Sequence, residues 1–399
     1  VNTGMYLMEC YPVYRKFLNE LRAVKRDGGC VSQTAPSGKG HLFDGSAGWS
    51  DAIDLIPWRM YLRYGNQDIL KENYEKIKEW LDFSLKRAKE DNPGRVRGKD
   101  DKYYSYLLDT GWHWGEWIEP DWNGFISGED PGGAYLRDIH DHGAPEVCTA
   151  HLSYGCQIAA EVAQLLGRKE EADHYCEMRR LTKLAYREAC MENGRMKQKR
   201  QCDYVHAVMF DMITDEEKKT TCDELNEMIV ENGFHLNTEF LSTCELLRVL
   251  SDYGHADTAW SLMLQDTYPG WLYQLKYHAT TIWEDWKGME EGKEPKDSMN
   301  HYSFGTFAGW LMDRAAGIRV EEGKIQICPV PDRRIGYVKA VYDSPLGEIR
   351  SSWEYVDALF RLEVEIPPNV TAEVIMPDGT RHEAGAGIHV YEIAGESVD

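Results

Sequence analysis

Two kinds of hydrophobic spacing divide the chain. Before Gly317, apolar residues recur every three or four positions, as at Leu70, Tyr74, Ile77 and Leu81. This spacing places them on one face of a helix. We expect helices at residues 68–85, 149–166, 170–189, 215–233, 237–250 and 256–265, with glycines at 167, 233 and 254 as helix stops.

After Gly317 the apolar residues alternate with polar ones, most clearly at residues 324–328 and 360–366. Alternation is typical of strands with one buried face. Proline and glycine turns separate these segments at 344–347, 367–369 and 377–379. The pattern predicts about six short strands, which would form a small all-β sandwich over residues 319–399 after a helical domain over residues 1–318.

Consecutive helix pairs joined by long loops favour a mainly α fold, an α/α toroid in which the loops at one end form a funnel. A helical solenoid is the alternative, although the sequence shows no self-similarity at a fixed period. Twelve of the 13 tryptophans precede the predicted boundary, and only Trp353 follows it. We therefore expect the ligand site in the helical part.

The charge balance excludes some partners. With 45 Lys and Arg against 67 Asp and Glu, the net charge is −22, so phosphate backbones and anionic lipid surfaces would repel the chain. No apolar run approaches the ~20 residues that span a bilayer. The ten cysteines form no CxxC pair, which favours buried free thiols over a disulfide framework. The first residue is Val1 and no signal peptide follows, so the sequence leaves the compartment open.

Two loops rich in tryptophan are candidates for sugar binding. The first places Trp49 two residues before Asp51, with Asp44 upstream as a weaker candidate. Indole rings suit stacking on sugars, and carboxylates accept hydrogen bonds from hydroxyls. Alternatively, Asp51 is a structural carboxylate at a helix N-terminus.

The second loop, residues 111–117, contains three tryptophans with His113 and Glu116. Because both polar residues would need partners in a core, we favour a sugar subsite with Trp114, Glu116 and Trp117. Core packing remains the alternative for one of the tryptophans.

A third segment, residues 278–288, places Glu284 next to Trp283, a further candidate for sugar binding, and two residues before Trp286. Apolar rings would desolvate this carboxylate and raise its pKa, as a general base that takes a proton from water requires. Asp285 is the rival carboxylate, and an exposed glutamate at a helix start is the alternative reading.

Downstream, Asn300 and His301 are candidate hydroxyl donors, although a lone histidine is often structural. The histidines at 140, 142 and 151 lack metal-ligand spacing, and the sequence has no phosphate loop or GxSxG motif. We therefore expect neither a metal nor a cofactor.

The order of these motifs resembles that of the α-L-rhamnosidases of glycoside hydrolase family 78. The resemblance extends over nearly the whole chain and rests on Ala47-Gly48-Trp49-Ser50-Asp51-Ala52, Ile56-Pro57-Trp58, Tyr64-Gly65-Asn66, residues 111–117, Tyr268-Pro269-Gly270-Trp271, residues 280–286, Asn300-His301-Tyr302 and Phe304-Gly305.

The resemblance implies an (α/α)6 barrel followed by a β-sandwich, and inverting hydrolysis of terminal α-L-rhamnosides. Such enzymes use an acid and a base whose carboxyl groups stand about 6.5–9.5 Å apart. The resemblance gives the base role to Glu284 and places Trp49, Trp114 and His301 around the rhamnose.

The sequence departs from the family pattern in three places. The family's acid motif, Asp-Cys-Pro-x-Arg-Glu, is absent, so we expect the acid, the first barrel helix and further domains upstream of Val1. We therefore expect this chain alone to be weakly active or inactive, since losing a general acid costs about 10²–10⁴-fold in rate. Glu116 stands where the family usually has Asp, and Asp285 where it often has Arg.

Two other functions stay open. One is a different α/α-barrel carbohydrate enzyme, such as an uronyl hydrolase or a polysaccharide lyase, although only Lys287 offers a cation near the aromatic segments. The other is a non-catalytic rhamnose-binding module.

Overall fold

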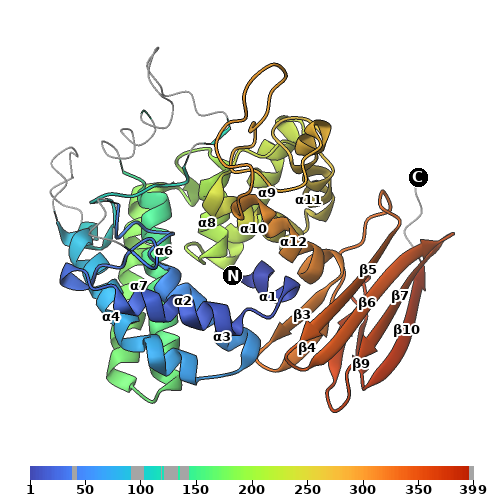
Figure 1. The fold of residues 1–399 in the computed structure, drawn as a ribbon, viewed down its shortest axis with the longest axis horizontal. Helices are drawn as coiled ribbons and strands as arrows, with labels where there is room; N and C mark the ends of the chain where they lie inside the picture. Colours follow the sequence, from blue (N-terminus) through green and yellow to red (C-terminus); the bar gives the residue numbers. More distant parts are fainter. Residues whose placement is uncertain (38–42, 91–102, 118, 121–133, 135–142, 395–399) are drawn as a thin grey trace. The chain divides into compact units, whose positions relative to one another are not determined.

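The computed structural model describes residues 1–37, 43–90, 103–117, 119–120, 134 and 143–394. Its α-helices are α1 (Asn2–Leu7), α2 (Tyr11–Ala23), α3 (Ala52–Tyr64), α4 (Asp68–Lys89), α6 (Pro145–Leu165), α7 (Lys169–Cys190), α8 (Gln201–Met209), α9 (Asp215–Glu231), α10 (Phe240–Asp252), α11 (Ala256–Met263) and α12 (Phe307–Trp310) (Figure 1). Short 3₁₀ turns lie at 27–29, 104–106, 271–277 and 303–306, and a π-turn at 311–315.

The six helices that the hydrophobic spacing predicts are confirmed as α4, α6, α7, α9, α10 and α11, with ends that differ by a few residues. The spacing misses α2 and α8. Helix α8 has nine residues, and all but its last are buried, so it has no polar face to reveal a helical period.

Spatial proximity groups the described chain into two compact units, neither continuous in sequence. The helical unit comprises residues 13–58 and 67–304, and the second unit comprises residues 1–12, 59–66 and 305–399. The domain boundary at residue 318 therefore stays a prediction. Within the helical unit, neighbouring helices such as α6 and α7, and α10 and α11, pack against each other as consecutive hairpins.

The C-terminal strands form two four-stranded sheets. Their strands are β3 (Ile318–Glu321), β4 (Lys324–Ile327), β5 (Tyr337–Ser344), β6 (Gly347–Val356), β7 (Leu359–Ile366), β8 (Ala372–Ile375), β9 (Arg381–Ala384) and β10 (Gly387–Ala394). The sheet orders are β10-β7-β6-β5 and β3-β4-β8-β9, and only the β4–β8 pair is parallel. A two-stranded hairpin, β1 (Met191–Glu192) with β2 (Arg195–Met196), lies in the helical unit.

The two C-terminal sheets share one hydrophobic core. Ile325 and Val374 from one sheet and Trp353 and Leu362 from the other belong to the same buried cluster. The sandwich prediction therefore holds, but with eight strands instead of about six.

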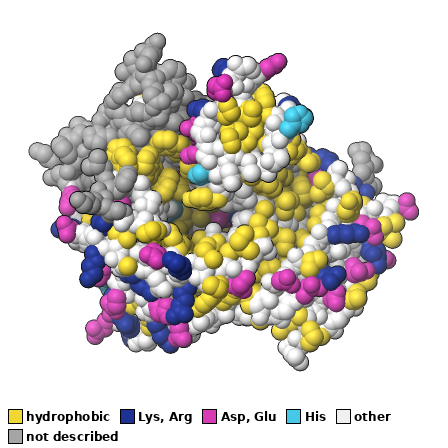
Figure 2. All heavy atoms as spheres, viewed as in Figure 1, with side chains coloured by type: hydrophobic (Ala, Val, Ile, Leu, Met, Phe, Trp, Pro, Cys, Tyr) yellow, Lys and Arg dark blue, Asp and Glu magenta, His cyan; other side chains and the backbone are white. Residues whose placement is uncertain are grey.

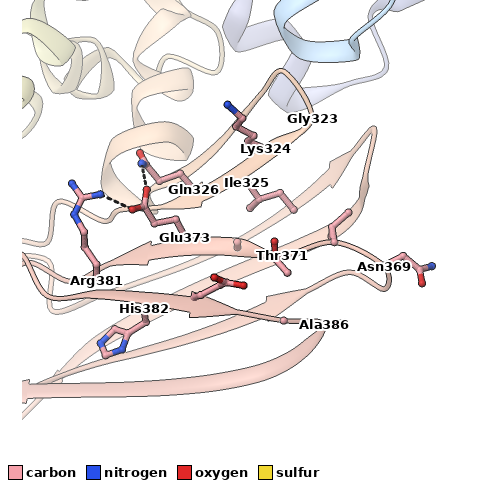
Figure 3. Close-up of a pocket in the computed structure, with 14 residues that line it drawn as sticks. Gly323, Lys324, Ile325, Gln326, Asn369, Thr371, Glu373, Arg381, His382 and Ala386 are labelled. Atoms are coloured by element: carbon pink, nitrogen blue, oxygen red, sulfur yellow. Dashed lines mark hydrogen bonds and ion pairs between the residues drawn. The ribbon is translucent and has the colours of Figure 1, made fainter.

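A pocket lies over strands β4, β8 and β9 and the turns beside them (Figure 3). Among its lining residues, the carboxylate of Glu373 accepts a hydrogen bond from Gln326 Nε2 at 2.9 Å and pairs with Arg381. Neighbouring strands therefore already satisfy this carboxylate.

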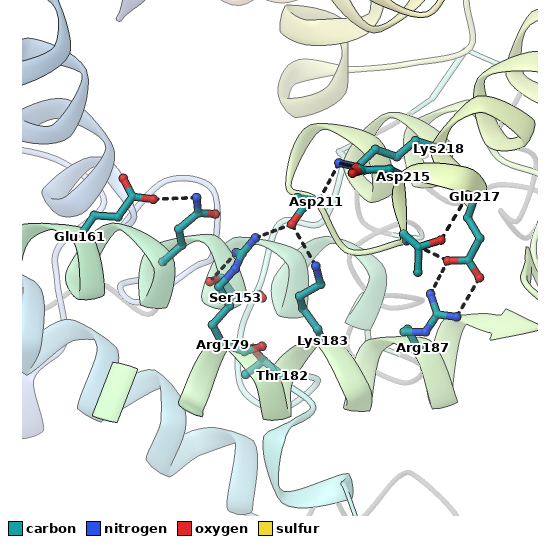
Figure 4. A network of polar contacts seen from close by, with 12 residues as sticks. Ser153, Glu161, Arg179, Thr182, Lys183, Arg187, Asp211, Asp215, Glu217 and Lys218 are labelled. Carbon is teal, nitrogen blue, oxygen red and sulfur yellow. Dashed lines mark hydrogen bonds and ion pairs between the residues drawn. The ribbon is translucent and has the colours of Figure 1, made fainter. Parts of the chain in front are cut away.

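A network of ion pairs ties α7 to the α8–α9 turn (Figure 4). Asp211 has a positive φ of 55° and bonds Arg179, Lys183 and Lys218, at 2.9, 2.9 and 2.6 Å. Partial burial opposes the ionised form, but the hydrogen bonds from the lysines prevail and lower the pKa of Asp211. The turn is thus held by three cations on one carboxylate.

The start of α9 is capped in the same region. Thr214 and Glu217 form a reciprocal capping box, and Arg187 of α7 also bonds Glu217. The hydrogen bond from Arg187 is the main reason that the pKa of Glu217 falls to about 2. These contacts fix the hairpin ends on which the neighbouring loops depend.

All ten cysteines lie in the described ranges without a disulfide, and seven are buried. Across the same ranges, none of the helices is long and apolar enough to cross a membrane.

Candidate active site at the N-terminal end of α10

The start of α10 is where the predicted site segments meet. The loop that contains Trp49 packs directly on it, because a Cβ atom at Gly48 would lie 2.5 Å from a methyl carbon of Leu241. Gly48 also has a φ of +82°, which L side chains rarely adopt. Glycine is therefore required here for the loop to reach the helix.

Hydrogen bonds join this loop to residues 110–117. The Ala47 N–H donates to His113 Nδ1 at 3.1 Å, and the Trp114 N–H donates to Ser46 Oγ at 3.1 Å. The buried Arg87 donates to the carbonyls of Gly45 and Thr110 at 2.6 and 2.9 Å. One guanidinium of α4 thus holds the two tryptophan loops together, a role that the sequence pattern did not reveal.

The indoles of these loops form one cluster. The ring centroid of Trp114 lies 6.1 Å from that of Trp49 and 5.2 Å from that of Trp117, and all three rings remain partly exposed. Gln33 accepts a hydrogen bond from Trp114 Nε1 at 2.7 Å. Figure 2 shows a hollow over the helical unit, with hydrophobic side chains around it and acidic atoms inside it.

Glu116 caps α10 from a distant part of the chain. Its Oε1 accepts from the N–H groups of Glu239 and Ser242 at 3.2 and 2.8 Å, and from the Ser242 hydroxyl. These N–H groups have no partners inside the helix. Oε2 lies 3.5 Å from His206 Nε2. Glu116 is 1% exposed, so the structure gives it the role of anchoring the helix.

Burial raises the pKa of Glu116 to about 7, although the hydrogen bonds from Ser242 act in the opposite direction. An unfolded glutamate titrates near 4.3. Between these values the folded chain holds a proton that the unfolded chain has lost, so this group makes stability fall as pH rises.

We expect Glu116→Gln to remove this decrease of stability with rising pH, because the amide oxygen can keep the α10 contacts without a charge. Relative to the unaltered chain, the variant should gain up to about 1.4 kcal/mol in unfolding free energy per pH unit between pH 5 and 7. Urea denaturation across this range measures the difference. Parallel pH profiles would show that Glu116 does not titrate there.

Glu284 lies on a segment that pairs with residues 298–301. The Glu284 N–H donates to the Ser298 carbonyl at 2.9 Å, the Ser298 N–H donates to Glu284 Oε2 at 3.2 Å, and the His301 N–H donates to the Ile282 carbonyl at 2.8 Å. The side chain of Glu284 is half-buried. The pairing thus places Glu284 and His301 on adjoining backbone stretches.

The two indoles beside Glu284 belong to the core. Trp283 is 2% exposed and lies near the ring of Tyr277. Trp286 is 1% exposed, stacks on Phe304 with centroids 3.9 Å apart, and donates from Nε1 to the Thr238 carbonyl at 3.1 Å. Their burial fixes the segment and leaves Glu284 partly open to solvent.

His301 reaches the same end of α10. Its ring stacks on Phe240, the first residue of the helix, with centroids 4.8 Å apart, and on the exposed Tyr302 at 4.9 Å. Asn300 is exposed, and its backbone bonds the hydroxyl of Ser298.

Asp44 and Asp51 have protein partners. Arg26 pairs with Asp44 at 2.6 Å. The buried Asp51 accepts from Trp80 Nε1 and the Gly48 N–H, both at 2.7 Å. Both carboxylates hold the loop in shape, so the structural alternative for Asp51 describes its contacts better than sugar binding does.

Sequence reasoning also missed Glu239, which precedes α10 and is 5% exposed. It looked like any other polar residue near a helix start, and only the fold shows that its N–H donates to Glu116, that Trp286 bonds Thr238 before it and that His301 stacks on Phe240 after it. Within the described ranges, no group of three or more His, Cys, Asp or Glu residues has a geometry that could hold a metal ion.

Comparison with protein families shows which known domains the chain matches. The bacterial α-L-rhamnosidase six-hairpin glycosidase domain matches residues 1–315, and the bacterial α-L-rhamnosidase C-terminal domain matches residues 323–390. This chain belongs to the bacterial α-L-rhamnosidase family. The predicted fold class, a six-hairpin barrel with a C-terminal β-domain, is thereby confirmed.

Individual members of this family are similar to the chain over nearly its whole length. An α-L-rhamnosidase from Formosa agariphila is 30% identical over 94% of this chain and 38% of its own length. The crystal structure of a Streptomyces avermitilis α-L-rhamnosidase complexed with L-rhamnose has a TM-score of 0.82 and 28% identity, and covers 98% of this chain and 37% of that one. The chain thus spans less than two fifths of the length of these rhamnosidases.

Proposed function

We propose that this chain forms the barrel and C-terminal domain of an inverting α-L-rhamnosidase, with Glu284 as the general base. In this reaction, Glu284 takes a proton from a water molecule as the oxygen attacks the anomeric carbon, and the bond to the leaving oxygen breaks on the opposite face. The proposal assigns only the base, because the acid motif of the family does not occur in the printed sequence.

The observation that supports this role is the unequal surroundings of the two carboxylate oxygens of Glu284. Oε2 accepts a hydrogen bond from the Ser298 N–H at 3.2 Å, while no described residue donates to Oε1. A base needs this combination, since one oxygen orients the group and the other receives the proton. The paired backbone of residues 282–284 and 298–301 holds it in place.

The rhamnose-binding residues in this proposal are Trp49, Trp114, Trp117, Asn300 and His301, which retain exposed surface. The C6 methyl group of rhamnose is apolar, so an indole wall suits it. Family membership and the L-rhamnose complex of the Streptomyces relative support this choice of sugar.

The proposal is tested with L-rhamnose binding by calorimetry and with turnover of p-nitrophenyl α-L-rhamnoside. We expect saturable L-rhamnose binding, no comparable L-fucose binding, and release of p-nitrophenolate. This leaving group departs as a stable anion, so the assay depends little on a general acid. Proton NMR of the early product should show β-L-rhamnose, the inverted anomer.

Binding without turnover, also in a longer protein that carries the acid motif of the family, would favour a rhamnose-binding module. Early release of the α-anomer would contradict the inverting mechanism, and absence of both binding and turnover would contradict the proposed function altogether.

A further inference from the structure

Two buried histidines lie next to carboxylates of the tryptophan loops and have no part in the base chemistry. His151 of α6 is 6% exposed, and His206 of α8 is 0% exposed. None of their four ring nitrogens forms a hydrogen bond with a described residue. A buried polar group without a partner is costly, and native proteins rarely keep one. Two imidazoles kept at this cost indicate a specific use.

Each imidazole faces a carboxylate from one of the two tryptophan loops. His151 Nδ1 lies 3.3 Å from Asp51 Oδ2, and His206 Nε2 lies 3.5 Å from Glu116 Oε2. Both carboxylates are buried. Glu116 Oε1 accepts the hydrogen bonds from the start of α10, while Oε2 has no hydrogen-bond partner in the described part of the chain. An N–H group on His206 Nε2 would supply this partner.

Phe210, the residue after α8, packs against both imidazoles. Its ring centroid lies 4.7 Å from that of His151 and 5.8 Å from that of His206, and the two imidazole centroids are 6.0 Å apart. The rings are therefore held beside the carboxylates. Hydrogen bonds that serve an active site often reach full alignment only with substrate bound, so distances of 3.3 and 3.5 Å suit contacts that tighten in the complex.

The carboxylates connect the imidazoles to the indoles assigned to rhamnose. Asp51 accepts a hydrogen bond from the Gly48 N–H at 2.7 Å, directly before Trp49. Glu116 directly precedes Trp117. A displacement of either carboxylate would therefore move an indole of the site.

The carboxylate that an imidazole faces decides which of its nitrogens carries the proton, because a neutral imidazole has a single N–H. Burial lowers the pKa of both histidines. At about pH 8, above the pKa of about 7 of Glu116, that group is a carboxylate and only accepts hydrogen bonds. The proton then belongs on Nδ1 of His151 and on Nε2 of His206.

We propose that His151 and His206 are positioning residues, which hold Trp49 and Trp117 for rhamnose binding through hydrogen bonds to Asp51 and Glu116. This inference rests on the proposed function. It gives a use to two polar rings in the interior of the helical unit.

Asparagine and glutamine distinguish the two ring nitrogens, because the asparagine N–H can replace Nδ1–H of histidine and the longer glutamine can replace Nε2–H. The matched variants, His151→Asn and His206→Gln, should bind L-rhamnose within about threefold of the unaltered chain. The mismatched variants, His151→Gln and His206→Asn, should bind it about tenfold more weakly, the effect of one lost hydrogen bond.

The loss should fall on binding and not on the chemical step. In the mismatched variants, kcat for p-nitrophenyl α-L-rhamnoside should change by less than about threefold, because Glu284 is held by its own pairing with Ser298. The same substitutions at His174, an exposed histidine of α7, are the controls and should leave the affinity unchanged. Circular dichroism checks that each variant folds.

A role in core packing alone would rank the two amides in the same order at both positions, and that result would overturn the inference. NMR of the histidine ring nitrogens at about pH 8 tests the unaltered chain without any variant. We expect the proton on Nδ1 of His151 and on Nε2 of His206, and the opposite tautomer at either residue would overturn the inference. If both tautomers are as expected but L-rhamnose does not bind, the proposed function fails and the two hydrogen bonds stand.

Discussion

Glu284→Gln is expected to lower kcat for p-nitrophenyl α-L-rhamnoside by about 10²–10⁴-fold, the usual contribution of a positioned base. The amide can keep the hydrogen-bonded geometry around Ser298 but cannot accept a proton from water. Affinity for L-rhamnose should therefore stay within about threefold of the unaltered chain, since the lost interaction exists only in the transition state. Steady-state kinetics and calorimetry measure the two quantities.

Glu294→Gln provides the matched control, because Glu294 is an exposed glutamate on the same loop. It should leave kcat and affinity unchanged. If Glu284→Gln retains kcat, the base must be another carboxylate, and Asp285 is the first to examine. That residue already bonds Lys296 and the Lys287 N–H.

Trp286→Ala is expected to destabilise the fold by about 3–5 kcal/mol, as truncation of a buried tryptophan usually does. The variant loses the stack on Phe304, the edge contact with Trp271 and the hydrogen bond to Thr238. Chemical denaturation measures the change in unfolding free energy.

Trp286→Phe separates the contributions of the ring and of the N–H group. It keeps a stacked ring and loses the donor, so we expect a cost of about 1–2 kcal/mol. If Trp286→Ala lost rhamnose binding with full stability, Trp286 would be a sugar platform instead of the core residue that the structure indicates.

Much of the fold can be predicted from the sequence. Helices such as α4 and α6 combine a long apolar stripe with polar ends, so the spacing of the apolar residues and the length of the segment both indicate a helix. Strands β4 and β7 alternate clearly between buried and partly exposed positions. Where local pattern and packing point the same way, sequence reasoning succeeds.

The site can be predicted only in part. The tryptophan loops and Glu284 stand out by composition, and the fold does bring their segments to one helix end. Residue type alone could not separate ligand-facing carboxylates from structural ones. Asp44 and Asp51 satisfy donors on Arg26 and Trp80, which only the tertiary structure brings close.

Burial separates residues that look alike in the sequence. Trp283 and Trp117 occur in similar aromatic runs, but Trp283 lies in the core and Trp117 keeps exposed surface. Glu239 has no distinguishing neighbours in sequence. Only the fold shows that its N–H donates to Glu116, which lies 123 residues away in the chain.

The most direct test of the account is azide rescue of Glu284→Gly. Azide needs no base, so it can occupy the space of the missing carboxylate and attack the anomeric carbon in place of water. The account predicts that azide restores p-nitrophenolate release and yields β-L-rhamnosyl azide. The role of Glu284 would be contradicted if the variant folds but azide neither accelerates p-nitrophenolate release nor yields β-L-rhamnosyl azide.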